Sequence, residues 1–422
     1  MKNKLLLIIL ITSCSVNFEK KILVENSIER RKTIGISYTN FEEAINEGYY
    51  NETKDFLMRN SKKIKENAQL TYALGKIFFI KKDYKNSVDL FLQVLNLTNP
   101  AMVIYGKTLW NLALLNYFRN NFSESYKNAE DAFKSGYLID KGFINFLKKS
   151  PEKIYKIENH FSEIDFEYAK KKLPIIESTI NENIKEKTII DTGASLTFVS
   201  FSLAEKLGIE ISDELKSQGF GFHNKVIPVW LSYIKSIEIN NLKIIDIPIM
   251  IFRDDDLTFG DYKINFGLGF HLLKEFKITM DYKKKKVSFE TYREEEYFPG
   301  NLILLGLRAG VEVSINGAGY YNFILDTGSE KTYITTSGTK KAVLSEKLNF
   351  FELITRGIGK AKVEYRKIED TTIGLSGYKV WYRNIISKME NIKYVDGILG
   401  NDFLENFKVV LDFPKNKITL IV

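Results

Sequence analysis

The chain has 422 residues, enough for about three domains of ordinary size. Its hydrophobic content of 44% and aromatic content of 13% exclude wholesale disorder. The net charge of +8 comes from lysines spread along the chain. No basic block alternates with aromatic residues, so the sequence does not predict a nucleic-acid partner.

Cysteine and histidine are too few for several kinds of catalytic site. Cys14 is the one cysteine, so the chain can form no internal disulfide and no thiolate metal site. The histidines, His160, His223 and His271, are not spaced as metal ligands, and no Ser or Cys nucleophile motif accompanies them. We therefore expect no metal and no cofactor, and carboxylates become the main catalytic candidates.

Residues 1–14 predict a secretory signal. Two lysines precede an apolar run, Leu5 to Ile11, that is too short to span a membrane. The Ile-Thr-Ser triplet before Cys14 resembles the lipobox of bacterial lipoproteins, whose cysteine is acylated and becomes the mature N-terminus. The resemblance implies a lipid anchor in the cell envelope, outside the cytoplasm, on the periplasmic face or the cell surface. The alternative is an ordinary signal with a chance cysteine.

Residues 15–35 are charged and mixed, and they predict a tether. From residue 36 to 150 the apolar residues recur at helical spacing with almost no β signal, which predicts an all-α domain. Residues 68–100, and a second stretch from Trp110, place small residues where two helices of a hairpin would touch. Both stretches resemble the tetratricopeptide repeat, a helix–turn–helix unit of about 34 residues. The resemblance implies a groove for a protein partner; the alternative is a purely structural spacer.

The rest of the chain contains an internal duplication. An Ile-Asn pair is followed, at the same interval, by a similar tetrapeptide in both copies: Asp191-Thr192-Gly193-Ala194 and Asp326-Thr327-Gly328-Ser329. Further downstream, Leu268–Leu273 recurs as Leu399–Leu404. Both copies alternate apolar and polar residues at period two and are rich in Ile, Val, Phe and Tyr. The pattern predicts two all-β lobes, residues 165–298 and 299–422.

The two Asp-Thr-Gly triplets define the resemblance of this region. Each follows an apolar pair that would end a buried strand, and each has a later apolar-Gly segment, Val395–Gly400 and the weaker Phe266–Gly269. This arrangement resembles the aspartic peptidases, and specifically their retropepsin-like branch, over residues 170–422. The resemblance implies a bilobal all-β aspartic-protease fold with two β-barrel lobes, following the helical repeats. It also implies a polypeptide substrate and a monomer that suffices for catalysis.

Hydrolysis of a peptide bond without a metal or a covalent nucleophile needs two carboxyl groups. One carboxylate takes a proton from water, while a second, protonated carboxyl polarises the carbonyl and protonates the leaving nitrogen. Two carboxyls held close together share one proton and titrate as a unit, and the aspartic-protease dyad is the standard example. We therefore predict that Asp191 and Asp326 are the catalytic pair.

The residues after each aspartate are predicted to support the catalytic loops. By resemblance, Thr192 and Thr327 would hydrogen-bond across the interface between the lobes. Gly193 and Gly328 would let a backbone N–H approach the carboxylate in a tight loop.

The two copies differ after the glycine, where one has Ala194 and the other Ser329. A hydroxyl at this position can donate to the carboxylate, so we do not expect the two aspartates to be equivalent. Gly267 also replaces a branched residue in the first apolar-Gly segment. Because of these two differences, an alternative is that the first lobe has a mainly structural role.

The family has hairpin flaps over its cleft, and a Gly-x-Gly turn follows each aspartate between strand-like stretches. These turns are Gly219-Phe220-Gly221 and Gly357-Ile358-Gly359. They predict one flap per lobe. Neither has the tyrosine of pepsin-type flaps, which favours the two-flap retroviral architecture. The alternative is that both are ordinary hairpin turns.

Three functions fit these features. The sequence favours an active aspartic endopeptidase that acts on polypeptides outside the cytoplasm. The first alternative is a catalytically silent relative that binds peptides in its cleft. The second is a cell-envelope scaffold that works through the tetratricopeptide-like domain.

Overall fold

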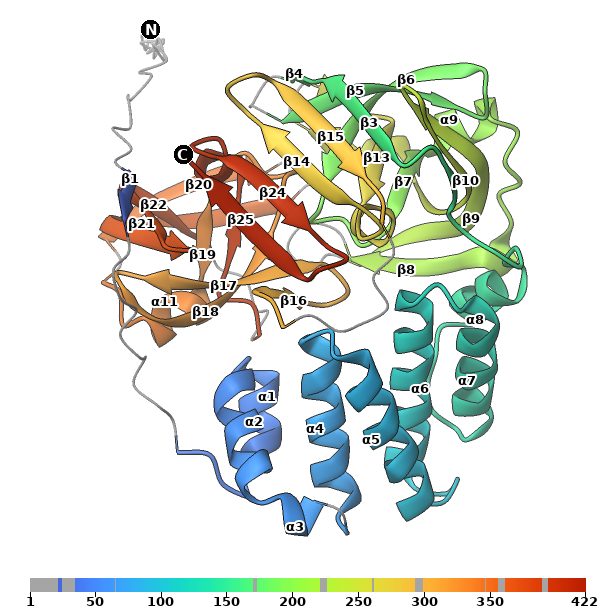
Figure 1. Cartoon of the computed structure of the whole chain (residues 1–422), viewed down its shortest axis with the longest axis vertical. Helices are drawn as coiled ribbons and strands as arrows, with labels where there is room; N and C mark the ends of the chain where they lie inside the picture. Colours follow the sequence, from blue (N-terminus) through green and yellow to red (C-terminus); the bar gives the residue numbers. More distant parts are fainter. Residues whose placement is uncertain are drawn as a thin grey trace, which may run out of the picture.

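The structure is a computed structural model that describes residues 22–24, 35–64, 66–169, 173–220, 226–259, 262–292, 299–345, 347–355, 361–388 and 394–422. A helical region is followed by β-rich domains, which confirms the predicted order of fold classes (Figure 1). Among the described residues, no helix combines the length and the hydropathy of a transmembrane span.

The helical region begins soon after residue 35. Its helices are α1 (Phe41–Asn46), α2 (Tyr50–Arg59), α3 (Ser61–Ile64), α4 (Ala68–Ile80), α5 (Tyr84–Leu97), α6 (Val103–Phe118), α7 (Phe122–Lys134) and α8 (Lys141–Lys148). Several begin at an Asp or Asn whose side chain accepts a hydrogen bond from a first-turn N–H, as at Asp83 and Asp140. Such caps satisfy N–H groups that have no partner within the helix.

Two helix pairs, α4–α5 and α6–α7, share one contact pattern. In the first pair, Ser87 Oγ donates to the Gly75 carbonyl at 2.9 Å. The second pair repeats this bond between Ser125 and the Ala113 carbonyl, at 2.8 Å. A Cβ atom at Gly75 would lie 2.9 Å from the ring of Phe91, so the helices of this pair approach closely. The small residues that the sequence placed at helix contacts therefore do lie there.

The first β lobe is built on one sheet that closes on itself. Its elements are β2 (Lys156–Glu158), β4 (Glu167–Tyr168), β5 (Pro174–Ile180), β6 (Ile184–Asp191), β7 (Thr197–Ser200), α9 (Phe201–Lys206), β8 (Lys216–Phe220), β9 (Val226–Ile239), β10 (Leu242–Phe252), β13 (Phe266–Gly269) and α10 (Phe270–Leu273), with a small hairpin of β11 (Thr258–Phe259) and β12 (Tyr262–Lys263). The sheet order is β2-β10-β7-β13-β6-β5-β9-β8. Because β10 also pairs with β9, the six strands from β10 to β9 form a closed barrel.

The second lobe repeats this topology. Its elements are β16 (Leu302–Leu304), β17 (Ala309–Ile315), β18 (Ala318–Leu325), β19 (Tyr333–Thr335), α11 (Thr336–Lys341), β20 (Lys347–Thr355), β21 (Ala361–Leu375), β22 (Tyr378–Lys388), β23 (Gly397–Leu399) and α12 (Asn401–Leu404). The order is β1-β22-β19-β23-β18-β17-β21-β20, and β22 pairs with β21 to close the second barrel. The duplicated sequence thus gives two barrels with matching strand order.

One extra short strand pairs with each barrel, at equivalent places in the two lobes. In the first lobe, β2 pairs with the start of β10. In the second lobe, β1 (Ile22–Val24) pairs with the start of β22 in the same antiparallel sense. Three residues of the predicted tether are therefore part of a sheet.

A further sheet joins the lobes, in the order β25-β24-β14-β15-β3. It is formed by β3 (Phe161–Asp165), β14 (Lys277–Asp281), β15 (Lys286–Glu290), β24 (Lys408–Asp412) and β25 (Lys417–Ile421). At its centre, Thr279 of β14 lies opposite Val410 of β24. These two residues are equivalent in the duplication, so a pseudo-two-fold axis relates the lobes through this pair. Figure 1 shows the two hairpins side by side.

The helical region packs against both lobes. On the first lobe, His271 of α10 is fully buried between helices, with Nε2 3.0 Å from the Tyr117 carbonyl and Nδ1 2.7 Å from the Tyr155 hydroxyl. On the second lobe, Asn322 donates to the Gly48 carbonyl at 2.8 Å. Because one hydrophobic core runs through α4–α8 and both lobes, the three parts are packed as one body.

Candidate active site

The two predicted catalytic aspartates lie at the ends of equivalent strands. Asp191 is the last residue of β6, and Asp326 directly follows β18. A Cβ atom at Gly193 would lie 2.5 Å from Asp326 Oδ1, and one at Gly328 would lie 2.6 Å from Asp191 Oδ1. Each carboxyl group therefore sits against the glycine of the opposite loop. No residue with a side chain fits either position without moving the catalytic pair.

Two threonines lock the loops to each other. Thr192 Oγ1 donates to the Leu325 carbonyl and Thr327 Oγ1 donates to the Ile190 carbonyl, both at 2.6 Å. Each hydroxyl also accepts the backbone N–H of the opposite threonine, at 3.1 Å in both directions. Both threonines are fully buried. The lobes thus meet through a reciprocal hydrogen-bond network directly beneath the carboxyl groups.

The environment of Asp191 favours its protonated form. The residue is 5% exposed, and its side chain hydrogen-bonds with that of Asp326. Burial, followed by the negative charge of Asp326, raises the pKa of Asp191 well above its ordinary value. The N–H groups of Gly193 and Ala194, 3.0 and 2.9 Å from Asp191 Oδ1, act in the opposite direction. The pair therefore retains a proton at a pH where a lone aspartate is ionised.

The loops are not equivalent, but the difference is not the one expected. The Ser329 hydroxyl donates to the Lys331 carbonyl at 3.0 Å rather than to Asp326. On the other side, Ala194 uses its backbone N–H to bond Asp191. The expectation that a hydroxyl after the glycine supports its own carboxylate is therefore wrong for Ser329, because the neighbouring carbonyl takes the hydrogen bond.

Each predicted flap has described strands beside it that pair with each other. Strands β8 and β9 form the first hairpin, and Gly219 and Phe220 are the last two residues of β8. Strands β20 and β21 form the second. Gly221 lies outside the described residues, as do all of Gly357-Ile358-Gly359 and the lipidation candidate Cys14.

The sequence did not predict how the first hairpin meets the catalytic loop. Ile227 and Val229 of β9 are buried in one hydrophobic cluster with Ile189 of β6 and Ala194 of the catalytic loop. The alternation of Ile227, Pro228 and Val229 indicated that the two branched residues face one side. Only the fold shows that this side faces the Asp191 loop.

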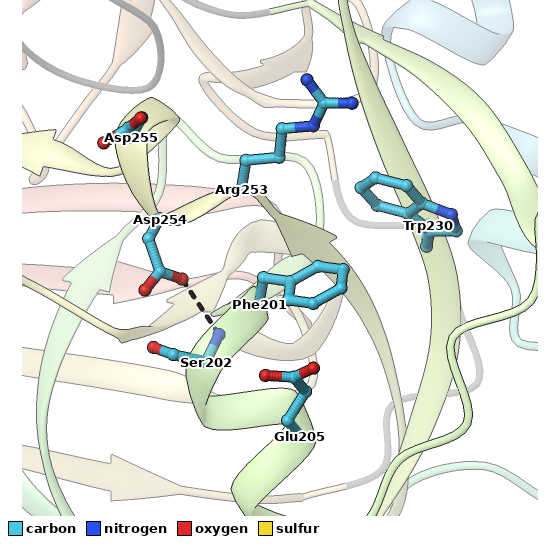
Figure 2. Close-up of a pocket in the computed structure, with 7 residues that line it drawn as sticks. All are labelled: Phe201, Ser202, Glu205, Trp230, Arg253, Asp254 and Asp255. Atoms are coloured by element: carbon cyan, nitrogen blue, oxygen red, sulfur yellow. Dashed lines mark hydrogen bonds between the residues drawn. The ribbon is translucent and has the colours of Figure 1, made fainter.

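A separate open cavity of about 590 Å³ lies at the foot of the same hairpin (Figure 2). It is lined by Phe201, Ser202, Glu205, Trp230, Arg253, Asp254 and Asp255. The carboxylate of Asp254 accepts the Ser202 N–H at 2.9 Å, and the Arg253 guanidinium lies 6.0 Å from the Trp230 ring. None of the predicted catalytic residues lines this cavity, so it is distinct from the carboxyl pair.

Within the described residues, no group of three His, Cys, Asp or Glu side chains is arranged to hold a metal ion. The chemistry that the arrangement can perform is proton transfer. Two carboxyl groups in contact, one protonated and one ionised, can activate a water molecule and protonate a leaving group.

Comparisons with known proteins relate the first of the two paired Asp-Thr-Gly loops to aspartic proteases. The family model described as gag-polyprotein putative aspartyl protease matches residues 176–261, which include the Asp191 loop. This match supports an aspartic protease at the level of the class.

Similar solved structures include a retropepsin-like aspartic protease from Rickettsia conorii, with 22% identity, 32% of this chain and 94% of that chain covered, and a TM-score of 0.23. Another is an aspartic proteinase from Irpex lacteus, with 11% identity, 62% of this chain and 97% of that chain covered, and a TM-score of 0.39. No curated protein matches the chain. The assignment of the site therefore rests on the geometry and on the family match.

Proposed function

We propose that this protein is an aspartic endopeptidase that hydrolyses peptide bonds with a water molecule activated between Asp191 and Asp326. The observation that carries the proposal is the contact of two carboxyl groups, one from each lobe, with the pKa of Asp191 raised by burial and by its partner. Two acidic groups in contact share a proton, which is the state needed for general acid–base catalysis.

In the proposed reaction, the ionised carboxyl of the pair removes a proton from water as the oxygen attacks the peptide carbonyl. The protonated carboxyl donates to the carbonyl oxygen, which gives a tetrahedral diol. The carboxyl that took the water proton then donates it to the leaving nitrogen as the C–N bond breaks, and the other carboxylate takes a proton from a diol hydroxyl, which restores the starting pair. The N–H groups of Gly193 and Ala194 hold Asp191 Oδ1, and the Gly328 N–H holds Asp326 Oδ1 at 2.8 Å. The backbone thus fixes how both carboxyl groups are oriented.

Asn substitutions at the two aspartates test the proposal. Asp191→Asn and Asp326→Asn should each reduce cleavage of an unfolded polypeptide by at least about a hundredfold, because each change removes one proton-transfer partner. Both changes are nearly isosteric, and circular dichroism should show an intact fold. Asp131→Asn, on an exposed position of α7, is the matched control and should cleave like the wild type. Normal cleavage by either variant would refute the proposal by placing catalysis on other residues, and a wild type that does not cleave would favour a peptide-binding relative.

We also propose that Cys14 is acylated and anchors the protein in the cell envelope, outside the cytoplasm. The support is the short apolar run that ends in Ile-Thr-Ser-Cys. Cys14→Ala should move the protein from the membrane fraction to the soluble fraction, because a signal of this length cannot span the bilayer. A variant that stays membrane-bound to the wild-type extent would contradict the lipid anchor.

For the helical region we propose tetratricopeptide-like repeats that serve mainly as structure. The repeated Ser–carbonyl bond in the pairs α4–α5 and α6–α7 supports the repeat. The core shared with both lobes supports the structural role over a scaffold for a separate partner, because the helices already bury apolar residues against the β domains.

A further inference from the structure

The N-terminus of α8 lies against the free edge of the first hairpin. Among the described strands, β8 is the last of its sheet, so one side of its backbone has no neighbour there. Gln218 of β8 is opposite Pro228 of β9. Because proline has no N–H, this is a pair without ladder hydrogen bonds, and the Gln218 N–H points to the open edge. An open edge needs a partner for such groups.

Asp140 provides that partner while it also begins α8. Its Oδ2 accepts the Gln218 N–H at 3.3 Å and the Ser217 hydroxyl at 3.1 Å. Its Oδ1 accepts the Phe143 N–H at 3.2 Å, which is the N-cap bond of the helix. A single carboxylate therefore ties the first turn of α8 to the backbone of β8.

Three more contacts hold α8 to the hairpin. A Cβ atom at Gly142 would lie 2.0 Å from the Lys216 carbonyl oxygen, so the helix and β8 are in backbone contact there. Phe146 stacks on Tyr233 of β9, with ring centres 4.8 Å apart. The Tyr233 hydroxyl donates to the Phe146 carbonyl at 3.3 Å. Helix α8 thus contacts both strands of the hairpin.

The other side of the hairpin contacts the catalytic loop. Ile227 and Val229 of β9 share a buried cluster with Ala194, whose N–H bonds Asp191. A continuous path of packed groups therefore runs from α8 through β8 and β9 to the loop that carries the first aspartate.

We propose that Asp140 and Gly142 are positioning residues for the active site: through them the helical region holds the β8–β9 hairpin in place against the Asp191 loop. The inference rests on the proposed peptidase function, and it gives the helical region a part in substrate binding. Since the carboxyl pair and its threonine bonds are not touched by α8, the effect of losing this contact falls on KM rather than on kcat.

Two substitutions in the full chain test the proposal. Asp140→Asn keeps one acceptor oxygen for the N-cap, and Asn is as good a cap as Asp, but its NH₂ group cannot accept from Gln218. Gly142→Ala favours the helix itself and displaces it from Lys216. The matched control is Asp83→Asn, which alters the N-cap of α5, where both carboxylate oxygens accept from Asn86 of the same helix.

Hydrogen exchange and kinetics give independent measurements. Asp140→Asn should speed amide exchange in residues 213–220 by roughly 3- to 10-fold and raise KM by a similar factor, as expected for one lost hydrogen bond. Gly142→Ala should increase the exchange rate and KM more strongly. In both variants kcat should stay within about two-fold of the wild type, and Asp83→Asn should match the wild type in every measurement. Unchanged exchange in both variants, or faster exchange with an unchanged KM, would overturn the proposal. A wild type without peptidase activity would refute the proposed function instead, and exchange would still decide whether α8 holds the hairpin.

Discussion

At the catalytic loops, two side chains that repel each other when ionised are held in contact. Asp191 is buried beside Asp326, and only the backbone N–H groups of Gly193 and Ala194 favour its charged form. Ionising Asp191 in the folded protein therefore costs free energy that ionising it in the unfolded chain does not. The candidate active site therefore lowers the stability of the fold wherever Asp191 would otherwise be ionised.

The sign of the pH effect follows from that cost. The folded-state pKa of Asp191 is raised above its value of 3.8 in a free chain, so between these two values the folded protein binds more protons. The stabilisation from the protonated group is fully present below 3.8 and is lost as the pH rises through the folded-state pKa. Asp191→Asn does not ionise. The variant should therefore unfold at a higher temperature than the wild type at pH 7.5, with a smaller difference at pH 4.5.

Scanning calorimetry at the two pH values measures this difference. Asp131→Asn is the control for replacing an aspartate at an exposed position. If Asp191→Asn were less stable than the wild type at pH 7.5, the buried carboxyl would be stabilising and the argument from burial would fail.

Among the loops and strands, the threonine network is where the two lobes depend on each other most directly. Thr192→Val keeps the shape of the side chain, but it removes the donor to the Leu325 carbonyl and the acceptor for the Thr327 N–H. We expect a loss of about 1–3 kcal/mol in the free energy of unfolding, because buried polar groups lose their partners. Cleavage should fall as well, because the loops lose their alignment.

Denaturant unfolding of single and double variants tests this expectation. The double variant of Thr192→Val and Thr327→Val should lose less free energy of unfolding than the sum of the losses in the two single variants, because both threonines belong to one network. The control is Thr108→Val, which removes a buried hydroxyl that bonds within α6. Fully additive effects would show that the two threonines act independently.

Much of this element-level organisation could be predicted from the sequence. The matched Asp-Thr-Gly triplets located the two loops that carry the carboxyl pair, and period-two alternation predicted the β lobes. Gly267, however, is not a weakened motif: a Cβ atom there would lie 2.3 Å from the ring of Phe198, which occupies the space of a side chain. The large side chain on one strand fits the glycine on its neighbour, and neither strand's sequence alone shows this match.

The short edge strands and the α8 contact could not be predicted for a related reason. Strands β1 and β2 have three residues each, too few to show a period. The contacts of Asp140 with β8 join residues that are 77 and 78 positions apart, and a capping Asp looks the same whether or not a strand lies beside it. These features depend on tertiary packing rather than on local pattern.

For the molecule as a whole, the shared core predicts cooperative unfolding. Each part has one tryptophan: Trp110 in α6, Trp230 in β9 and Trp381 in β22. Variants that keep one tryptophan and replace the other two by Phe report on each part separately. We expect the three fluorescence midpoints in urea to coincide, because unfolding any part exposes apolar surface of the others. An earlier transition at Trp110 would show that the helical region is an independent domain.

One pair of equivalent positions in the two lobes differs in its chemistry and in its contacts. His271 and Asp402 are equivalent, since their N–H groups bond the equivalent carbonyls of Ser195 and Glu330. Asp402 closes its own loop by accepting the Thr332 N–H at 2.7 Å, whereas burial keeps the pKa of His271 far below its ordinary range and the neutral ring bonds helix α6. If the second lobe occupied the place of the first against α6, Asp402 would bring a carboxylate to the Tyr117 carbonyl, and two acceptors cannot bond each other. At this contact the two lobes are therefore not interchangeable.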